Sequence, residues 1–298
     1  MALDSLGGGI WNTALGVGAG DNHASGSFNT YIGGQAAGSA WQGTTPSADG
    51  SNNTFVGSAA GYLITTAYGD TFMGTNAGGN VTSGYQNTFV GVNAGGGGVN
   101  AGGGAGAGIT TGNNNLALGR DAGANLTTGS YNIFIGNKGP SNPDTESNTI
   151  RIGDSNQSQT YIAGIWNTTT GYGDAVPVVI DSAGQLGTAS SSRRFKTDIA
   201  DMGDTTETLM SLRPVQFRYI AHGPGAPLQY GLIAEEVAEV APELVAHNAK
   251  GEIQTVFYDK VNAMLLNQVQ TQQRQIETQQ KAIADLESRL AELESRAK

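Results

Sequence analysis

The sequence predicts a mainly β, trimeric β-solenoid or β-roll fibre, followed by an α+β domain and a C-terminal three-stranded coiled coil. Three observations support this fold class. A short glycine-containing motif recurs along the first half of the chain. Residues 191–298 are different in composition, with 12 of the 15 Lys and Arg residues. From Asp259 onward there is neither Pro nor Gly, and apolar residues recur every seven positions.

The repeated unit is N-T-x-φ-G-x-x-A-G, in which φ is an apolar residue. Its eight copies begin at Asn12, Asn29, Asn53, Asp70, Asn87, Asn115, Asn132 and Asn148. Successive copies lie 17, 24, 17, 17, 28, 17 and 16 residues apart, so 17 is the common step and the longer steps contain insertions. One unit cannot bury its own apolar side, whereas stacked units can. A disordered Gly/Ser linker is the alternative, and the fixed apolar positions argue against it.

The side chains available to fill one such stack are mostly small, so we expect three chains to share an axis. The repeats resemble the heads of trimeric autotransporter adhesins and repeats of phage and prophage tail fibres. This resemblance covers residues 11–153 and implies left-handed parallel β-rolls built from three chains. We therefore assign residues 1–153 to a repeat fibre. Asp70 and Asp121 occupy repeat positions and are interpreted as structural.

Residues 154–190 are expected to form a β-stalk or linker between the fibre and the rest of the chain. Residues 160–165 and 176–180 are rich in β-branched and aromatic residues, which favour strands, and glycines separate them.

The next segment, residues 190–196, reads Ser-Ser-Ser-Arg-Arg-Phe-Lys and offers a hydroxyl and an amine five positions apart. Serine is a weak nucleophile unless a base removes its proton. Lysine can be that base only where burial or neighbouring positive charge lowers its pKa. Taken alone, this segment is more typical of a Ser- and Arg-rich linker.

The residues that follow change this interpretation. Three stretches, 195–199, 209–219 and 230–245, resemble in order the peptidase S74 intramolecular chaperone domain of phage tailspikes and endosialidases. The resemblance covers 191–298 and implies a Ser-Lys dyad that cleaves its own chain between Ser190 and Ser191. Ser191 is then the nucleophile and Lys196 the base. Of the family pattern S-D-x-R-x-K, this sequence keeps the Ser, Arg and Lys and has Ser192 in place of the Asp.

The serine run leaves the register open, because Ser190 and Ser192 flank the expected nucleophile. We assign residues 191–258 to the chaperone and autoprotease domain and 259–298 to a coiled-coil helix. His222 and His247 are interpreted as surface residues. Glu235 and Glu236 either orient Lys196 or, as we favour, lie on a solvated helix face.

The C-terminal helix has the apolar seam of a coiled coil. One position of the seven-residue repeat holds Val269, Ile276, Ile283 and Leu290, and its companion holds Leu265, Gln272, Gln279, Leu286 and Leu293. The Gln layers weaken such a seam but fix its register. A membrane-binding or calmodulin-type helix is the alternative, and the Gln content and mixed charge argue against it.

These elements together predict a trimeric tail-fibre-like or adhesin-like protein whose C-terminal chaperone drives trimerisation and leaves by autoproteolysis. A trimeric surface adhesin that does not cleave, and so retains that domain, is the alternative. A glycan-degrading depolymerase is less favoured, because the repeats contain few acidic residues for a catalytic pair. Phage, prophage and injection-system origins all fit.

Composition narrows the partners. The net charge of -10 argues against nucleic acid, and the chain has no cysteine and only three histidines. We expect no cofactor, no metal and no membrane span, and residues 1–5 show no secretory signal. Expected partners are two further copies, a host surface glycan or receptor, and a baseplate or other fibre protein at the N-terminus. The expected location is a virion tail fibre or an extracellular particle surface. The insertions near 39–52 and 95–114 are candidate contact loops.

Overall fold

The computed structural model describes residues 8–21, 25–38, 50–96, 108–140, 145–248 and 250–296. The chain divides into two compact units, Met1–Trp166 and Asn167–Lys298. We call these the solenoid unit and the C-terminal unit and describe each by itself. Most of both expected contact loops, residues 39–49 and 97–107, lies outside the described residues.

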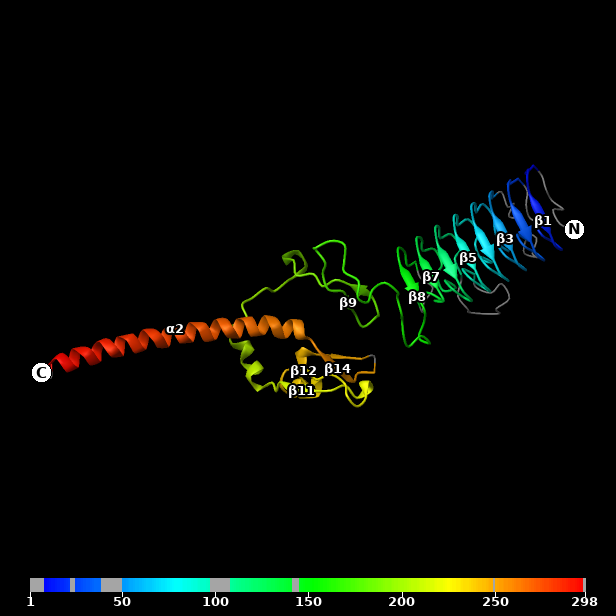
Figure 1. The fold of residues 1–298 in the computed structure, drawn as a ribbon. Coiled ribbons are helices and arrows are strands. Elements are labelled where there is room, and N and C mark those ends of the chain that lie inside the picture. Colours follow the sequence, from blue (N-terminus) through cyan, green and yellow to red (C-terminus); the bar gives the residue numbers. More distant parts are fainter. Residues whose placement is uncertain are drawn as a thin grey trace. The chain divides into compact units, whose positions relative to one another are not determined.

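The solenoid unit is a stack of turns, each of which contributes one short strand to a single parallel sheet (Figure 1). The strands lie side by side in sequence order, and each pairs in register with the next. The mainly β parallel solenoid that the repeats predict is therefore confirmed. The strands are β1 Thr13–Leu15, β2 Thr30–Ile32, β3 Thr54–Val56, β4 Thr71–Met73, β5 Thr88–Val90, β6 Leu116–Leu118, β7 Ile133–Ile135 and β8 Ile150–Ile152.

The last turn corrects one detail of the repeat. Ile150 pairs with Ile133, and the backbone N–H of Thr149 donates to the side chain of Asn132. Thr149 therefore takes the place that Asn holds in the earlier turns, and Asn148 is one position before it. The final step is 17 residues rather than 16.

Aromatic side chains form a column inside the stack. The residue x of each repeat points inward, and Tyr31, Phe55, Phe72, Phe89 and Phe134 are all buried. Neighbouring rings stack almost parallel, with centroids 4.7 Å apart for Phe55 and Phe72 and 4.9 Å apart for Phe72 and Phe89. These distances match the spacing of adjacent strands. Columns of alanine and of larger aliphatic residues complete the core at Ala60, Ala77, Ala94, Ile64, Val81, Ile109 and Leu126.

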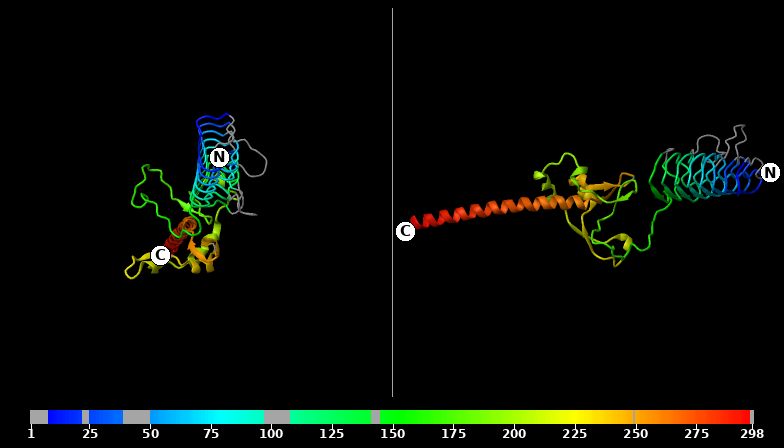
Figure 2. Two further views of the ribbon diagram at one scale, coloured as in Figure 1. Left: turned by 90° about the vertical axis from the view of Figure 1, so that its right-hand side faces the viewer. Right: turned by 90° about the horizontal axis from the view of Figure 1, so that it is seen from above.

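A single chain thus closes its own core. The left view of Figure 2 looks along the stack, with the turns lying one behind another. We expected a thin stack to need other chains in order to fill its interior, and this reasoning was wrong. The turn that contains the longest insertion also contributes to this core through Ile109, which is buried. The inward strand residue of the next turn, Ala117, is also buried but is small. Any partner chain would cover the outside of the solenoid.

A buried polar column runs beside the aromatic one. The side-chain oxygen of each Asn that opens a repeat accepts a hydrogen bond from the backbone N–H of the equivalent residue in the next turn. Examples are Asn29 to Asn53 at 2.9 Å and Asn115 to Asn132 at 3.1 Å. Satisfied in this way, these amides can stay buried without the cost of an unpaired polar group.

Glycine is required where a turn meets the aromatic column. Gly78 has φ of 59°, and a Cβ there would lie 2.4 Å from the ring of Phe72. Both its conformation and its closeness to the ring therefore exclude a side chain.

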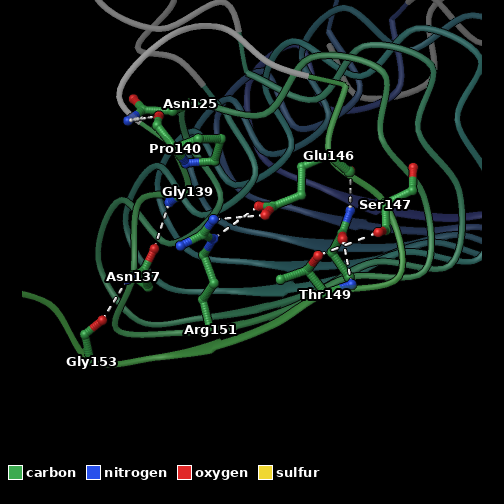
Figure 3. Close-up of polar contacts among 10 residues, drawn as sticks. Asn125, Asn137, Gly139, Pro140, Glu146, Ser147, Thr149, Arg151 and Gly153 are labelled. Carbon is green, nitrogen blue, oxygen red and sulfur yellow. Dashed lines mark hydrogen bonds and ion pairs between the residues drawn. The ribbon is translucent and has the colours of Figure 1, made fainter. Parts of the chain in front are cut away.

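The C-terminal end of the solenoid unit carries a charged pair (Figure 3). Arg151 stands where four of the seven earlier turns have Phe, and its guanidinium binds both oxygens of Glu146, at 2.9 and 2.7 Å. The backbone carbonyl of Glu146 accepts from the side chain of Asn132 at 2.8 Å, which ties the pair to the Asn column. This polar end closes the stack in the way that capping repeats do.

The C-terminal unit joins small sheets to a long helix. β9 Val179–Ile180 pairs with β10 Leu186–Gly187, β11 Val215–Phe217 with β12 Gln229–Gly231, and β13 Val245–His247 with β14 Ile253–Val256, all antiparallel. The helices are η1 Arg193–Phe195, η2 Gly203–Ser211, η3 Ile220–His222, α1 Ala234–Val240, η4 Pro242–Leu244 and α2 Tyr258–Arg296.

Its small core lies where α1, β13 and β14 meet the start of α2. The buried members are Leu209, Val237, Ala241, Leu244, Val245, Val256 and Val261. Hydrogen bonds also join η2 to α2. The side chain of Asn267 donates to the carbonyl of Gly203, and the side chain of Gln268 accepts from the hydroxyl of Thr206. The first turns of α2 therefore belong to the folded domain.

The expected strands of the bridge are mostly absent from the single chain. Residues 160–165 form no strand, and of 176–180 only Val179 and Ile180 do. A strand needs a neighbour to take its backbone hydrogen bonds. Within one chain, only the short β9–β10 hairpin provides that neighbour.

Candidate functional site

Ser191 and Lys196 come together across one helical turn. η1 lies between them and is closed by two backbone hydrogen bonds of 3.1 Å, from Phe195 to Ser192 and from Lys196 to Arg193. This turn brings Nζ of Lys196 to 3.1 Å from Oγ of Ser191. That distance is within the hydrogen-bonding reach that a general base needs.

Two arginines, Arg193 and Arg194, lie between the serine and the lysine in the chain. The guanidinium carbon of Arg194 lies 4.7 Å from the ring centroid of Phe195, a cation–π contact. Among the ion pairs of the described residues, none includes Arg193, Arg194 or Lys196. Sequence reasoning missed the contact between Arg194 and Phe195. The signal for it was that an Arg and a Phe are adjacent in the sequence, between the two expected site residues.

The contact is open to solvent in one chain, because every residue from 191 to 200 is exposed. A base of this kind works at neutral pH where burial or nearby positive charge favours its neutral form. The reaction also needs donors that stabilise the oxyanion. One chain thus provides the contact between nucleophile and base, and the shelter would have to come from further protein surface.

The other titratable residues considered from the sequence lie elsewhere. Glu236, in α1, forms a two-pronged ion pair with Arg213, with a distance of 3.0 Å between its Oε2 and the Arg Nε. His222 and His247 are exposed, as expected, and His222 meets the ring of Tyr219 edge-on. Within the described residues, no three His, Asp or Glu side chains are grouped to hold a metal ion.

Asp121 has a structural role like the one we expected. Its Oδ1 accepts from Asn93 at 3.0 Å, and its Oδ2 lies 3.5 Å from Arg120 and 3.6 Å from Lys138. The described part of the chain contains no helix that is both long and apolar enough to span a bilayer.

The chain thus combines a β-solenoid with a small C-terminal α+β domain. In the C-terminal unit, the side chains of Ser191 and Lys196 lie within hydrogen-bonding distance of each other. Residues 191–246 match a family model, Peptidase_S74, described as the chaperone of endosialidase. The match begins at Ser191 and supports the chaperone domain inferred from the sequence. Searches of curated proteins and of solved structures found no match. The likeness of the repeats to adhesin heads therefore remains a prediction.

Proposed function

We propose that this chain is one protomer of a homotrimeric tail-fibre-like protein whose C-terminal chaperone domain drives trimerisation and is then released by cleavage between Ser190 and Ser191. The observation that carries the proposal is the 3.1 Å contact between Lys196 and Ser191, at the first residue of the matched segment. The matched family is one of self-cleaving peptidase chaperones.

The proposed reaction is an acyl transfer followed by hydrolysis. Neutral Lys196 takes the proton from Oγ of Ser191, and this oxygen attacks the carbonyl carbon of Ser190. The peptide bond to the nitrogen of Ser191 breaks, and that nitrogen takes up a proton and becomes the new N-terminus. Water then hydrolyses the ester, which leaves a carboxylate on Ser190 and restores the Ser191 hydroxyl. Each chain reacts once.

The exposed seam of α2 supports the trimer. Leu265, Val269, Ile276, Ile283, Leu286, Leu290 and Leu293 are all exposed in one chain, at the spacing of a coiled coil. Seven large apolar side chains along one side of an otherwise polar helix call for partner helices. A three-stranded coiled coil of α2 would bury them.

The outer face of the solenoid sheet supports it too. The residue φ of each repeat points outward, and none of the eight is buried in one chain: Leu15, Ile32, Val56, Met73, Val90, Leu118, Ile135 and Ile152. They form an unbroken aliphatic column along the stack. A homotrimer would place such columns at the same height in each copy and let them cover one another.

Assembly and cleavage are linked in this proposal. Interleaved β structures fold slowly, because non-local pairing costs loop entropy before it gains contacts. The coiled coil would hold three chains in register while they fold, and packing around residues 191–200 would supply the shelter that one chain lacks. Removal of the chaperone then leaves a fibre whose stability is kinetic.

A trimeric surface adhesin that keeps its C-terminal domain is the second candidate. Two observations favour it: the open position of the Ser191–Lys196 contact, and Ser192 in place of the Asp of the family pattern. In both candidates we propose a host surface glycan or receptor as the target, a baseplate or other fibre protein as the N-terminal partner, and a particle surface as the location. The outward aromatics Trp11, Phe28, Tyr68 and Tyr131 support a sugar target.

Denaturing gels of expressed full-length protein test the reaction. Wild type is expected to give two bands, one fragment that ends at Ser190 and one that begins at Ser191. Ser191→Ala and Lys196→Ala are each expected to give one band, the uncleaved chain. Ser190→Ala and Ser192→Ala are the matched controls and should still cleave. Cleavage that survives Ser191→Ala but stops with Ser192→Ala would move the nucleophile by one residue. If neither the wild type nor any variant is cleaved, the result supports the adhesin that retains its C-terminal domain.

A further inference from the structure

Residues 155–190 carry apolar side chains that a single chain leaves in water. Every residue of this segment is exposed, including the ten large apolar residues Tyr161, Ile162, Ile165, Trp166, Tyr172, Val176, Val178, Val179, Ile180 and Leu186. Trp166 is 92% exposed. The solenoid turns, in contrast, bury their aromatic and aliphatic columns within one chain. Monomeric proteins seldom leave so many neighbouring apolar groups uncovered.

This composition is not that of a flexible linker. Flexible linkers are built mainly of Gly and Ser, and disordered segments combine few aromatic and β-branched residues with high net charge. This segment has ten large apolar residues among its glycines and serines, and Asp174 and Asp181 are its only charged residues. It also has local order, since the carboxylate of Asp181 accepts from the backbone N–H groups of Ala183 and Gln185, both at 2.9 Å, and shapes the β9–β10 turn.

The charge of the segment indicates what covers it. With two acidic and no basic side chains, it offers neither a basic surface for an acidic partner nor a strongly acidic one for a basic partner. An apolar, weakly charged partner fits best, and the same segment of another copy has that chemistry. The two-residue strands β9 and β10 also leave backbone groups free at their edges, which strands of another copy can pair with.

The α2 seam brings the copies together. Its apolar spacing indicates a coiled coil. In a homotrimer with parallel α2 helices, the identical segments of the three copies would arrive together and in the same register. We propose that residues 155–190 of the copies pack against one another as an interlocked apolar interface. This inference rests on the homotrimer of the proposed function and deepens it.

The position of the segment gives this interface a role. It lies on the N-terminal side of the Ser190–Ser191 bond, whereas α2 lies on the other side. Cleavage would remove the coiled coil and keep the interlocked segment. The coiled coil therefore starts the assembly, and residues 155–190 hold the copies together after it has gone.

Trp166 reports directly on this interface. In full-length protein with Trp11→Phe and Trp41→Phe, Trp166 is the one remaining tryptophan. We expect its emission to be shifted to the blue, and its quenching by acrylamide to be several-fold weaker than that of a free tryptophan. The matched control adds Ile276→Glu and Ile283→Glu, which disrupt the α2 seam and should leave Trp166 as accessible as in one chain. Native mass, measured on the same samples, gives the number of copies.

The outcomes separate the two claims. A trimer with a protected Trp166 supports the interface. A trimer whose Trp166 is quenched as fully as in the seam variant overturns the interface and leaves the proposed function standing. A full-length monomer overturns both.

A second variant tests persistence after cleavage. In the self-cleaving full chain, Val178→Ser with Ile180→Ser is expected to leave cleavage intact and to make the released 1–190 trimer dissociate at least several-fold faster on dilution, while Gln159→Ser leaves the rate unchanged. If the doubly substituted fragment dissociates no faster than wild type, the segment does not hold the copies together. Circular dichroism of the fragment checks that the solenoid, whose core lies outside this segment, is still folded.

Discussion

Oδ1 of Asp70 accepts two hydrogen bonds from Asn87, from its backbone N–H at 2.7 Å and from its side-chain N–H at 3.1 Å, while Oδ2 is buried with no partner. Other turns have an amide nitrogen at the place of Oδ2, and it donates to a backbone carbonyl 14 residues further on where the turn has no insertion, as Asn53 does to Ala67. Asp70 thus presents an oxygen where the column needs a donor. A protonated carboxyl restores that donor.

Stability should therefore fall as the pH rises. Burial raises the pKa of Asp70 from 3.8 to about 7. Because the folded state holds this proton more tightly than the unfolded chain, the contribution is complete below the unfolded pKa and is lost as the pH rises through the folded one. The loss across this window is on the order of 4 kcal/mol. Denaturant unfolding of the solenoid at about pH 4 and about pH 8 measures it.

The Asp70→Asn variant isolates this effect. The amide supplies the missing donor at every pH, so the variant should be more stable than wild type near neutral pH and lack this part of the pH dependence. Asn115→Asp is the matched control, because it places a second carboxyl in the same column and should steepen the decline. An unchanged pH profile in Asp70→Asn would mean that Asp70 is not the group responsible.

Two glycines with the same backbone conformation should respond differently to alanine. Gly78 and Gly123 have φ of 59° and 65°, but a Cβ at Gly78 meets the Phe72 ring at 2.4 Å, whereas at Gly123 its nearest neighbour is 3.2 Å away. Gly123→Ala costs about 1 kcal/mol for the left-handed conformation, and the Phe134 ring need shift only slightly to admit the methyl group. Gly78→Ala adds overpacking of about 1–3 kcal/mol. Thermal unfolding compares them, and equal losses would contradict the account of the aromatic column.

Tyr131 is an aromatic residue in a left-handed conformation, with φ of 60° and 63% of its surface exposed. The equivalent positions of neighbouring turns hold Asn114 and Asn148, with φ of 55° and 60°. Asparagine tolerates this region better than tyrosine does. Tyr131→Asn should therefore stabilise the solenoid by about 1 kcal/mol, and Asn114→Tyr should destabilise it by a similar amount. A lower melting temperature for Tyr131→Asn would show that the ring makes a compensating contact.

The charged pair at the end of the stack should keep solenoids from joining end to end. Arg151→Phe extends the aromatic column and leaves Glu146 without its partner. We expect this variant to self-associate in sedimentation experiments, while Arg151→Lys, which keeps a charge, stays dispersed. Wild-type behaviour of Arg151→Phe would show that the pair is not needed as a cap.

The repeat motif was sufficient to predict the turns, the order of the strands and most of their register. It did not reveal that x faces inward and φ outward, because both are often apolar and a three-residue strand has too few alternations to decide. It also did not reveal that one chain closes its own core. Larger core residues such as Ile64 and Leu126 lie outside the motif, in segments that vary from turn to turn.

The contact of Ser191 with Lys196 was predictable from spacing and resemblance, because a single helical turn lies between them. The strand expected at residues 160–165 was not found, since β-propensity can be realised only where a neighbouring strand is present. The Arg151–Glu146 pair was missed, although Arg in place of Phe in the last repeat was a visible signal.

Native mass spectrometry of purified wild type tests the central claim most directly. The account predicts an assembly of three copies of residues 1–190, with residues 191–298 recovered as a separate fragment that begins at Ser191. A single, uncleaved chain of 298 residues would contradict it.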